Sequence, residues 1–167
     1  MGVRTRIAAY RTRPDAILVA LLLVPLGLLL VAELIMSLEW RMVHDIPLFH
    51  YAAYLMDRYH YALYKDIFVN NLPGTFLLHL AIGKLFGYGD LALRLVDIGW
   101  LCALLAVTWG IMRRFDKRVA FASAIAFGLS YLQHGPVMSL QRDYLGILPI
   151  ATALLLLVSQ SRMGARL

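Results

Sequence analysis

The chain has 167 residues, of which 61% are hydrophobic and only 16% are charged. Soluble domains of this length carry roughly a quarter of charged residues, so the composition excludes an ordinary soluble domain and predicts an all-α integral membrane protein. The formal net charge is +6, but the basic residues gather beside hydrophobic segments, where they orient membrane helices. We therefore expect this charge to meet membrane lipids, and we expect no nucleic-acid partner.

Four apolar segments have the composition of membrane spans. In chain order, we expect a basic tail at residues 1–15, spans at 16–39, 91–112, 119–133 and 144–160, an outer loop at 40–90, a basic loop at 113–118, a second outer loop at 134–143 and a tail at 161–167. A span needs about 20 residues, so the last two spans must be lengthened by residues that flank their apolar segments. The first is too long for a cleaved signal peptide, and we expect it to remain as an anchor in a single membrane unit.

The first outer loop is expected to contain two helices that lie on the membrane surface. Over about residues 46–60, apolar residues recur at helical spacing and leave a polar side. Over residues 73–87, an apolar segment begins at Pro73 behind an expected asparagine cap, Asn70 or Asn71. If this segment lies on the surface instead of crossing, every basic cluster falls on the cytoplasmic side, together with both termini.

Polar residues gather in the two outer loops, which this topology brings to one face. The first loop holds His44, Asp45, Lys65, Asp66 and Asn70, and the second ends in Gln141, Arg142 and Asp143. The two loops thus offer carboxylates and cations to one site. Asp45 also has a structural interpretation, because it precedes a helical turn and is a suitable cap.

The remaining polar residues predict structural roles. The histidines at positions 44, 50, 60 and 134 lack the paired spacing of a metal site, and the single cysteine excludes a cysteine-based one, so we expect no protein-bound metal. Arg94 and Asp97 lie one helical turn apart within an expected span, where unpaired charges are costly, so we expect a structural ion pair. Asp90 is expected to cap that span.

Five motifs follow one another along the outer loops. They are His44-Asp45, Tyr64-Lys65-Asp66, Asn70-Asn71-Leu72-Pro73-Gly74, Phe86-Gly87-Tyr88-Gly89-Asp90 and Gln141-Arg142-Asp143. Their order resembles the N-terminal part of GT-C-type membrane glycosyltransferases, and is most similar to bacterial proteins of the protein-mannosyltransferase and lipid A aminoarabinose-transferase class. Such proteins have an acidic residue in the first outer loop, two juxtamembrane helices and a second acidic residue beyond the third span.

The resemblance implies transfer of a sugar from a polyprenyl-phosphate carrier to an acceptor on the outer side of the bacterial inner membrane. The lipid-linked donor is the substrate, and no cofactor is implied. By this resemblance Asp45 is the catalytic residue that takes the proton of the acceptor hydroxyl, and Asp143 is the second acidic residue. Arg142 would offset the charge of the departing phosphate, with Lys65 as a second candidate. The implied substrate-binding set also includes Asp66, His44, Asn70 and Gln141.

GT-C enzymes usually continue with further spans, whereas this chain stops after its expected fourth. We therefore expect the chain to be truncated relative to the family, with a partner membrane protein or a second copy completing the cavity. The alternative is a catalytically inactive membrane scaffold or lipid-binding subunit. A third interpretation, transport of a lipid-linked saccharide, would need a polar path across the membrane.

Overall fold

The computed structural model describes the backbone of residues 13–164 and the side chains of residues 17–159. Its helices are α2 (Arg13–Met36), α3 (Ile46–Tyr59), α4 (Pro73–Phe86), α5 (Asp90–Met112), α6 (Lys117–Gln133) and α7 (Arg142–Gly164), with short 3-10 helices η2 (Ser37–Glu39) and η3 (Gly135–Met138). No strand forms within residues 13–164, so the all-α prediction is confirmed. Most of the expected N-terminal tail, and the last residues of the C-terminal one, lie outside the described residues.

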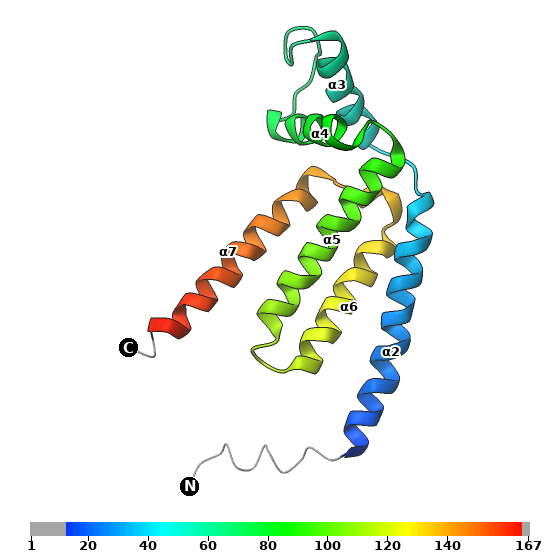
Figure 1. Cartoon of the computed structure of the whole chain (residues 1–167). Coiled ribbons are helices and arrows are strands. Elements are labelled where there is room, and N and C mark those ends of the chain that lie inside the picture. The colour runs from blue at the N-terminus through cyan, green and yellow to red at the C-terminus, as the bar shows by residue number, and fades with distance from the viewer. Residues whose placement is uncertain (1–12, 165–167) are drawn as a thin grey trace.

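The four long helices lie side by side in one layer, in the order α7, α5, α6, α2 (Figure 1). Helix α5 packs against both α6 and α7, and α6 packs against α2. Helices α3 and α4 pack on each other over one end of the layer, where α4 runs across the start of α5 (Figure 1). The turn between α5 and α6 lies at the other end.

Two glycines allow the long helices to approach closely. A Cβ atom on Gly128 of α6 would lie 2.8 Å from a methyl group of Leu30 and 3.3 Å from one of Leu105. A Cβ on Gly110 of α5 would lie 3.3 Å from Leu155 of α7. Small residues at helix crossings let the backbone of one membrane helix approach the side chains of another. Gly128 therefore allows α6 to pack closely on α2 and α5, and Gly110 allows α5 to pack closely on α7.

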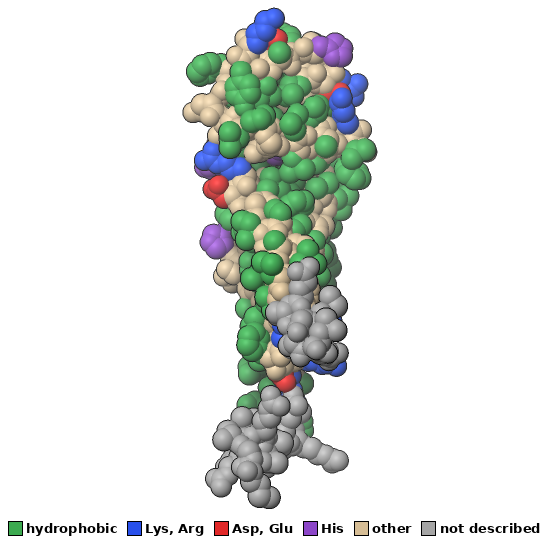
Figure 2. Space-filling model, turned by 90° about the vertical axis from the view of Figure 1, so that its left-hand side faces the viewer, with side chains coloured by type: hydrophobic (Ala, Val, Ile, Leu, Met, Phe, Trp, Pro, Cys, Tyr) green, Lys and Arg blue, Asp and Glu red, His purple; other side chains and the backbone are tan. Residues whose placement is uncertain are grey.

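Within the described residues, three helical segments are long and apolar enough to cross a membrane, namely Ile17–Glu39, Asp90–Met112 and Arg142–Ser159. Helix α6, the other expected span, has 17 residues and is shorter than these three. Apolar side chains of α2 are largely exposed, as in Leu21 and Leu28, both 66%, which suits a helix surrounded by lipid. Figure 2 shows hydrophobic side chains along most of one face, with most of the basic side chains in its upper part and at its lower end.

Helices α3 and α4 enclose a hydrophobic core outside the four-helix layer. The rings of Phe49 and Phe76 meet edge to face with centroids 5.3 Å apart, and both side chains are buried. Ile46, Leu93 and Leu140 belong to the same buried cluster. Because Leu93 lies on α5 and Leu140 precedes α7, apolar contacts anchor the α3–α4 pair to the helix layer.

The expected asparagine cap of α4 is wrong. The N-cap residue is Leu72, which makes no side-chain capping bond. Pro73 is the first helical residue, and the residue before a proline is held in an extended conformation, so the helix starts after both asparagines. The side chain of Asn71 instead accepts a hydrogen bond from Arg142.

The expected cap of α5 is displaced by one residue. Gly89 is the N-cap, and Asp90 is the first residue of the helix. The Asp90 carboxylate accepts a hydrogen bond from the backbone N–H of Met42 at 2.9 Å. Asp90 therefore ties the segment before α3 to the start of α5.

Candidate functional site

The segment before α3 holds two of the expected site residues. His44 has a φ of 59°, which few residues other than glycine adopt. Its Nδ1 atom lies 3.5 Å from the carboxylate of Asp45, whose side chain is 48% exposed. Asp45 occupies the N-cap position of α3 without a side-chain capping bond. Its carboxylate is therefore not engaged in capping and is open to solvent.

The second outer loop meets the first through two side-chain contacts. Gln141 Nε2 lies 3.4 Å from His44 Nδ1. Arg142 donates a hydrogen bond to Asn71 Oδ1 at 2.5 Å, and its Nε lies 3.8 Å from the exposed carboxylate of Asp143. The fold thus brings together polar residues that are far apart in the sequence.

A cavity of about 640 Å³ opens between the starts of α4 and α7. Expected site residues Asn70, Arg142 and Asp143 line it together with Asn71. Small and apolar residues of α4 and α7 complete the lining, among them Gly74, Thr75, Leu78 and Leu145. Because a guanidinium presents its donors as a rigid fork, the polar wall of this cavity suits an anion, and an apolar wall lies beside it.

Lys65 and Asp66 lie in an exposed turn, outside the lining of that cavity. The Asp66 carboxylate accepts a hydrogen bond from the backbone N–H of Ala62 at 2.8 Å, which closes the turn. Tyr64 in the same turn has a φ of 67° and donates its hydroxyl to the carbonyl of Asn71 at 2.7 Å. The turn therefore supports Asn71 from outside, and the observed contact of Asp66 is structural.

A buried polar network lies behind this outer face. Arg94 and Asp97, 2% and 0% exposed, form the ion pair that their spacing predicts. Arg94 also donates to the hydroxyls of Ser37 and Ser139, and its guanidinium lies 4.4 Å above the Trp40 ring. A charge buried among apolar helices is tolerated when it is paired and hydrogen-bonded. Arg94 and Asp97 are paired with each other, and Arg94 makes further hydrogen bonds to two hydroxyls.

Asp97 also holds the second outer loop. Its carboxylate accepts hydrogen bonds from the hydroxyl of Tyr131 at 2.6 Å and from the backbone N–H of Leu140 at 3.0 Å. Leu140 has a φ of 47°, an unusual conformation for leucine, and Gln141 follows directly. The position of the polar segment 141–143 therefore depends on a carboxylate buried in α5. Sequence reasoning missed Tyr131 and Leu140 as partners of Asp97, because no spacing links a tyrosine of α6 or a residue of the second outer loop to an aspartate of α5.

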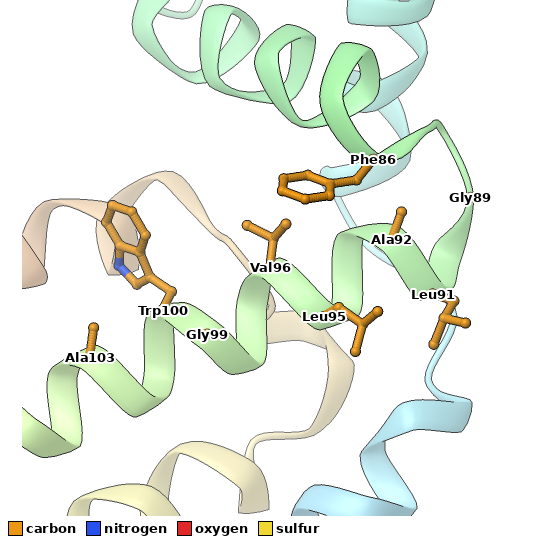
Figure 3. A pocket seen from close by; sticks show the side chains of 9 residues that line it. All are labelled: Phe86, Gly89, Leu91, Ala92, Leu95, Val96, Gly99, Trp100 and Ala103. Atoms are coloured by element: carbon orange, nitrogen blue, oxygen red, sulfur yellow. The ribbon is translucent and has the colours of Figure 1, made fainter.

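An apolar groove of about 730 Å³ runs along α5 below the end of α4 (Figure 3). Phe86 of α4 reaches over the groove, while Leu95, Val96 and Trp100 come from α5 (Figure 3). A Cβ atom on Gly99 would meet nothing within 4 Å, so the groove is open at that position. No charged side chain lines it, which suits a hydrocarbon chain.

Helices α3 and α4 share a buried pair of histidines, His50 and His79, whose Nδ1 atoms lie 3.1 Å apart. Burial lowers the pKa of His50, and burial together with the neighbouring His50 lowers the pKa of His79 to about 4. Both rings are therefore neutral near pH 7, and one Nδ1–H donates to the other Nδ1. The described part of the chain holds no group of three His, Cys, Asp or Glu side chains suited to a metal ion.

No family model, no curated protein and no solved structure matches this chain.

Proposed function

We propose that the chain is a membrane glycosyltransferase, or part of one, that transfers a sugar from a polyprenyl-phosphate carrier to an acceptor on the outer face of the bacterial inner membrane. The observation that carries this proposal is the cavity between α4 and α7, where Arg142 contacts Asn71 beside Asn70 and Asp143. A cation, amides and a carboxylate next to an apolar wall match the chemistry of a lipid-linked sugar phosphate. The resemblance of the outer-loop motifs to GT-C enzymes points to the same substrate class.

In the proposed reaction, an acceptor hydroxyl attacks the anomeric carbon of the sugar, and the bond from that carbon to the phosphate oxygen breaks. Asp45 takes the proton of the attacking hydroxyl, while His44 and Gln141, in contact with each other, orient this segment. The phosphate oxygen leaves with the electron pair of the broken bond. Arg142 stabilises the charge that develops on it, and Asp143 is available to the sugar hydroxyls.

The hydrocarbon chain of the proposed carrier would lie in the apolar groove on α5. The polar cavity lies at the first turn of α4. The apolar groove on α5 begins at Phe86, which is the last residue of α4. Helix α4 has 14 residues and so is about 20 Å long. An isoprenoid chain of several units covers that length, so one carrier can occupy both.

The proposal includes four spans with both termini in the cytoplasm, so that α6 crosses the membrane as well. Support comes from α6 lying lengthwise between α5 and α2 (Figure 1). Basic residues gather around the α5–α6 turn, at the end of the layer opposite α3 and α4; they are Arg113, Arg114, Lys117 and Arg118. Such clusters face the cytoplasm. Membrane lipids, and either a partner membrane protein or a second copy of the chain, complete the site.

The experiment is to measure binding and sugar release from a radiolabelled polyprenyl-phosphate sugar mixture by the purified chain, with a membrane fraction added to supply acceptors and partners. Asp45→Asn keeps the side-chain size and should bind the donor normally while release falls by about 10² to 10⁴-fold. Arg142→Gln should weaken binding about tenfold or more, because it removes a charged hydrogen-bond donor. Lys117→Gln removes an exposed charge at the far end and should change neither quantity.

Release by Asp45→Asn at the native rate would exclude Asp45 as the base. Unchanged binding by Arg142→Gln would exclude Arg142 as the phosphate ligand. Native chain that binds the donor but never releases sugar, even with the membrane fraction, would favour the alternative of a lipid-binding subunit or inactive scaffold. The apolar groove supports that alternative equally well. Absence of donor binding would refute the proposed lipid-linked substrate.

A further inference from the structure

A cavity of about 460 Å³ beside α3 shares no lining residue with the cavity between α4 and α7. Its lining residues include Tyr51, Tyr54 and Tyr88, together with His50 and Asp90. None of these tyrosines, nor Asp90, takes part in the proposed sugar transfer. The proposed sugar transfer therefore gives no role to the aromatic rings and the carboxylate of this cavity.

The aromatic rings form a continuous wall. Tyr51 and Tyr54 are stacked, with centroids 6.3 Å apart and an interplanar angle of 19°. Tyr88 meets Tyr54 edge to face at 5.3 Å and lies 5.2 Å from the His50 ring. The Tyr88 ring packs directly against Gly83, and a Cβ atom on that glycine would lie 2.1 Å from the ring. This close packing holds the Tyr88 ring in place without a ligand.

Asp90 supplies the charge of this cavity. One of its oxygens accepts the Met42 N–H, which holds the carboxylate at the cavity. Among residues 17–159, no lysine or arginine forms an ion pair with Asp90. Burial lowers the pKa of His50 despite the opposing effect of Asp90, so His50 is neutral near pH 7. The lining therefore carries a single formal charge, which is negative.

We propose that this cavity binds an organic ammonium group, the headgroup of an ethanolamine or choline phospholipid. Tyrosine faces attract an organic cation through the ring quadrupole, and the Asp90 carboxylate neutralises its charge. The cavity is lined by α3, by Met42 before it, and by Tyr88 and Asp90 at the start of α5. Helix α3 and the start of α5 lie at one end of the apolar helix layer (Figure 1), where lipid headgroups would surround the protein. This assignment stands independently of sugar transfer.

Interfacial tyrosines also occur as an aromatic belt, which contacts headgroups without selecting their charge. The two explanations differ in one respect. A belt would tolerate a neutral ligand and would not need Asp90, whereas the proposed site needs both a cation and the carboxylate.

The test is a titration of the purified chain, in a neutral detergent, with choline and with its uncharged isostere 3,3-dimethylbutan-1-ol, followed through the NMR signals of labelled tyrosine rings. Choline should bind at least tenfold more tightly than the isostere. Asp90→Asn keeps an acceptor for Met42 and should lose about tenfold in choline affinity. Tyr51→Leu, at a position 60% exposed, should lose about three- to thirtyfold, and the control Tyr51→Phe should stay within about twofold because it keeps the ring face.

A second arm identifies the source of the ammonium group. Native mass spectrometry of the chain from mixed nanodiscs should show retention of phosphatidylethanolamine or phosphatidylcholine over phosphatidylglycerol, and Asp90→Asn should lose that preference. Choline binding without any lipid preference would overturn the phospholipid assignment and leave a free ammonium compound as the ligand. Equal binding of choline and its isostere, unchanged affinity in Asp90→Asn, or no binding at all would overturn the site.

Discussion

Replacing Asp97 with asparagine should lower the free energy of unfolding by about 3–5 kcal/mol. Asp97 is fully buried and accepts hydrogen bonds from Arg94, Tyr131 and Leu140. Asparagine has the same size, but its NH₂ group must face at least one of these donors, and the Arg94 charge is left without a counter-ion. The expected loss is that of a buried ion pair broken from one side, because the remaining charge keeps its desolvation cost.

Two further variants separate the possible causes of that loss. The double substitution Arg94→Met with Asp97→Leu removes both charges and should recover part of the stability, since an apolar pair often replaces a buried ion pair without cost. The recovery is partial because Tyr131 and the Leu140 N–H still lose their acceptor. Asp143→Asn makes the same chemical change at a carboxylate that is 93% exposed and lies 3.8 Å from Arg142. That control should stay within about 0.5 kcal/mol of the native chain.

The assay is equilibrium unfolding in mixed detergent micelles, followed by tryptophan fluorescence. Trp40 reports on the network directly, because its ring lies 4.4 Å below the Arg94 guanidinium. A loss below about 1 kcal/mol for Asp97→Asn, comparable to an exposed pair, would refute the view that this carboxylate holds the second outer loop. A double variant no better than the single one would show that the hydrogen bonds lost by Tyr131 and the Leu140 N–H, and not the unpaired charge, dominate at this position.

Three other predictions concern the outer helices and the topology. Lowering the pH from 7.5 to 5 should reduce stability by about 2 kcal/mol, because in this window unfolded His79 takes up a proton that the buried ring, with a pKa of about 4, does not. The variant His79→Leu should lose most of this pH dependence, and an unchanged slope in urea or detergent unfolding would contradict the reasoning. Gly83→Ala should cost about 1–3 kcal/mol, because its Cβ would lie 2.1 Å from the Tyr88 ring, whereas Gly74→Ala, with no atom within 4 Å, should be neutral or stabilising in the same measurement. In a Cys102→Ser background, cysteines at Asp66 and Val137 should react with an impermeant thiol reagent applied outside intact cells, and one at Lys117 should not; labelling at Lys117 would exclude the four-span topology.

Part of the candidate site was accessible from sequence patterns, because it depends on order along the chain. The polar residues of the outer loops follow from their position between apolar segments, and Arg142 and Asp143 line a cavity with Asn70. Lys65 and Asp66 were grouped with them only because they are polar and belong to the same loop. The turn closed by hydrogen bonds with Ala62 keeps Lys65 and Asp66 outside that cavity. No local sequence pattern predicted this turn.

The sequence by itself determined that the protein is all-α, where its helices lie, and that Arg94 and Asp97 form a pair, since helical periodicity and charge in an apolar segment are local properties. It predicted the start of α4 at Pro73 but not the N-cap residues of α4 and α5, which are Leu72 and Gly89 and not an asparagine and Asp90. Only the tertiary structure decided that Asp97 holds Leu140, that Gln141 meets His44, and that tyrosines of α3 and Asp90 share a cavity. Asp97 and Leu140 are 43 positions apart, His44 and Gln141 are 97 apart, and the tyrosines of α3 are also distant from Asp90 in the sequence. The energies of these contacts arise from packing and burial that exist only once the helices have assembled.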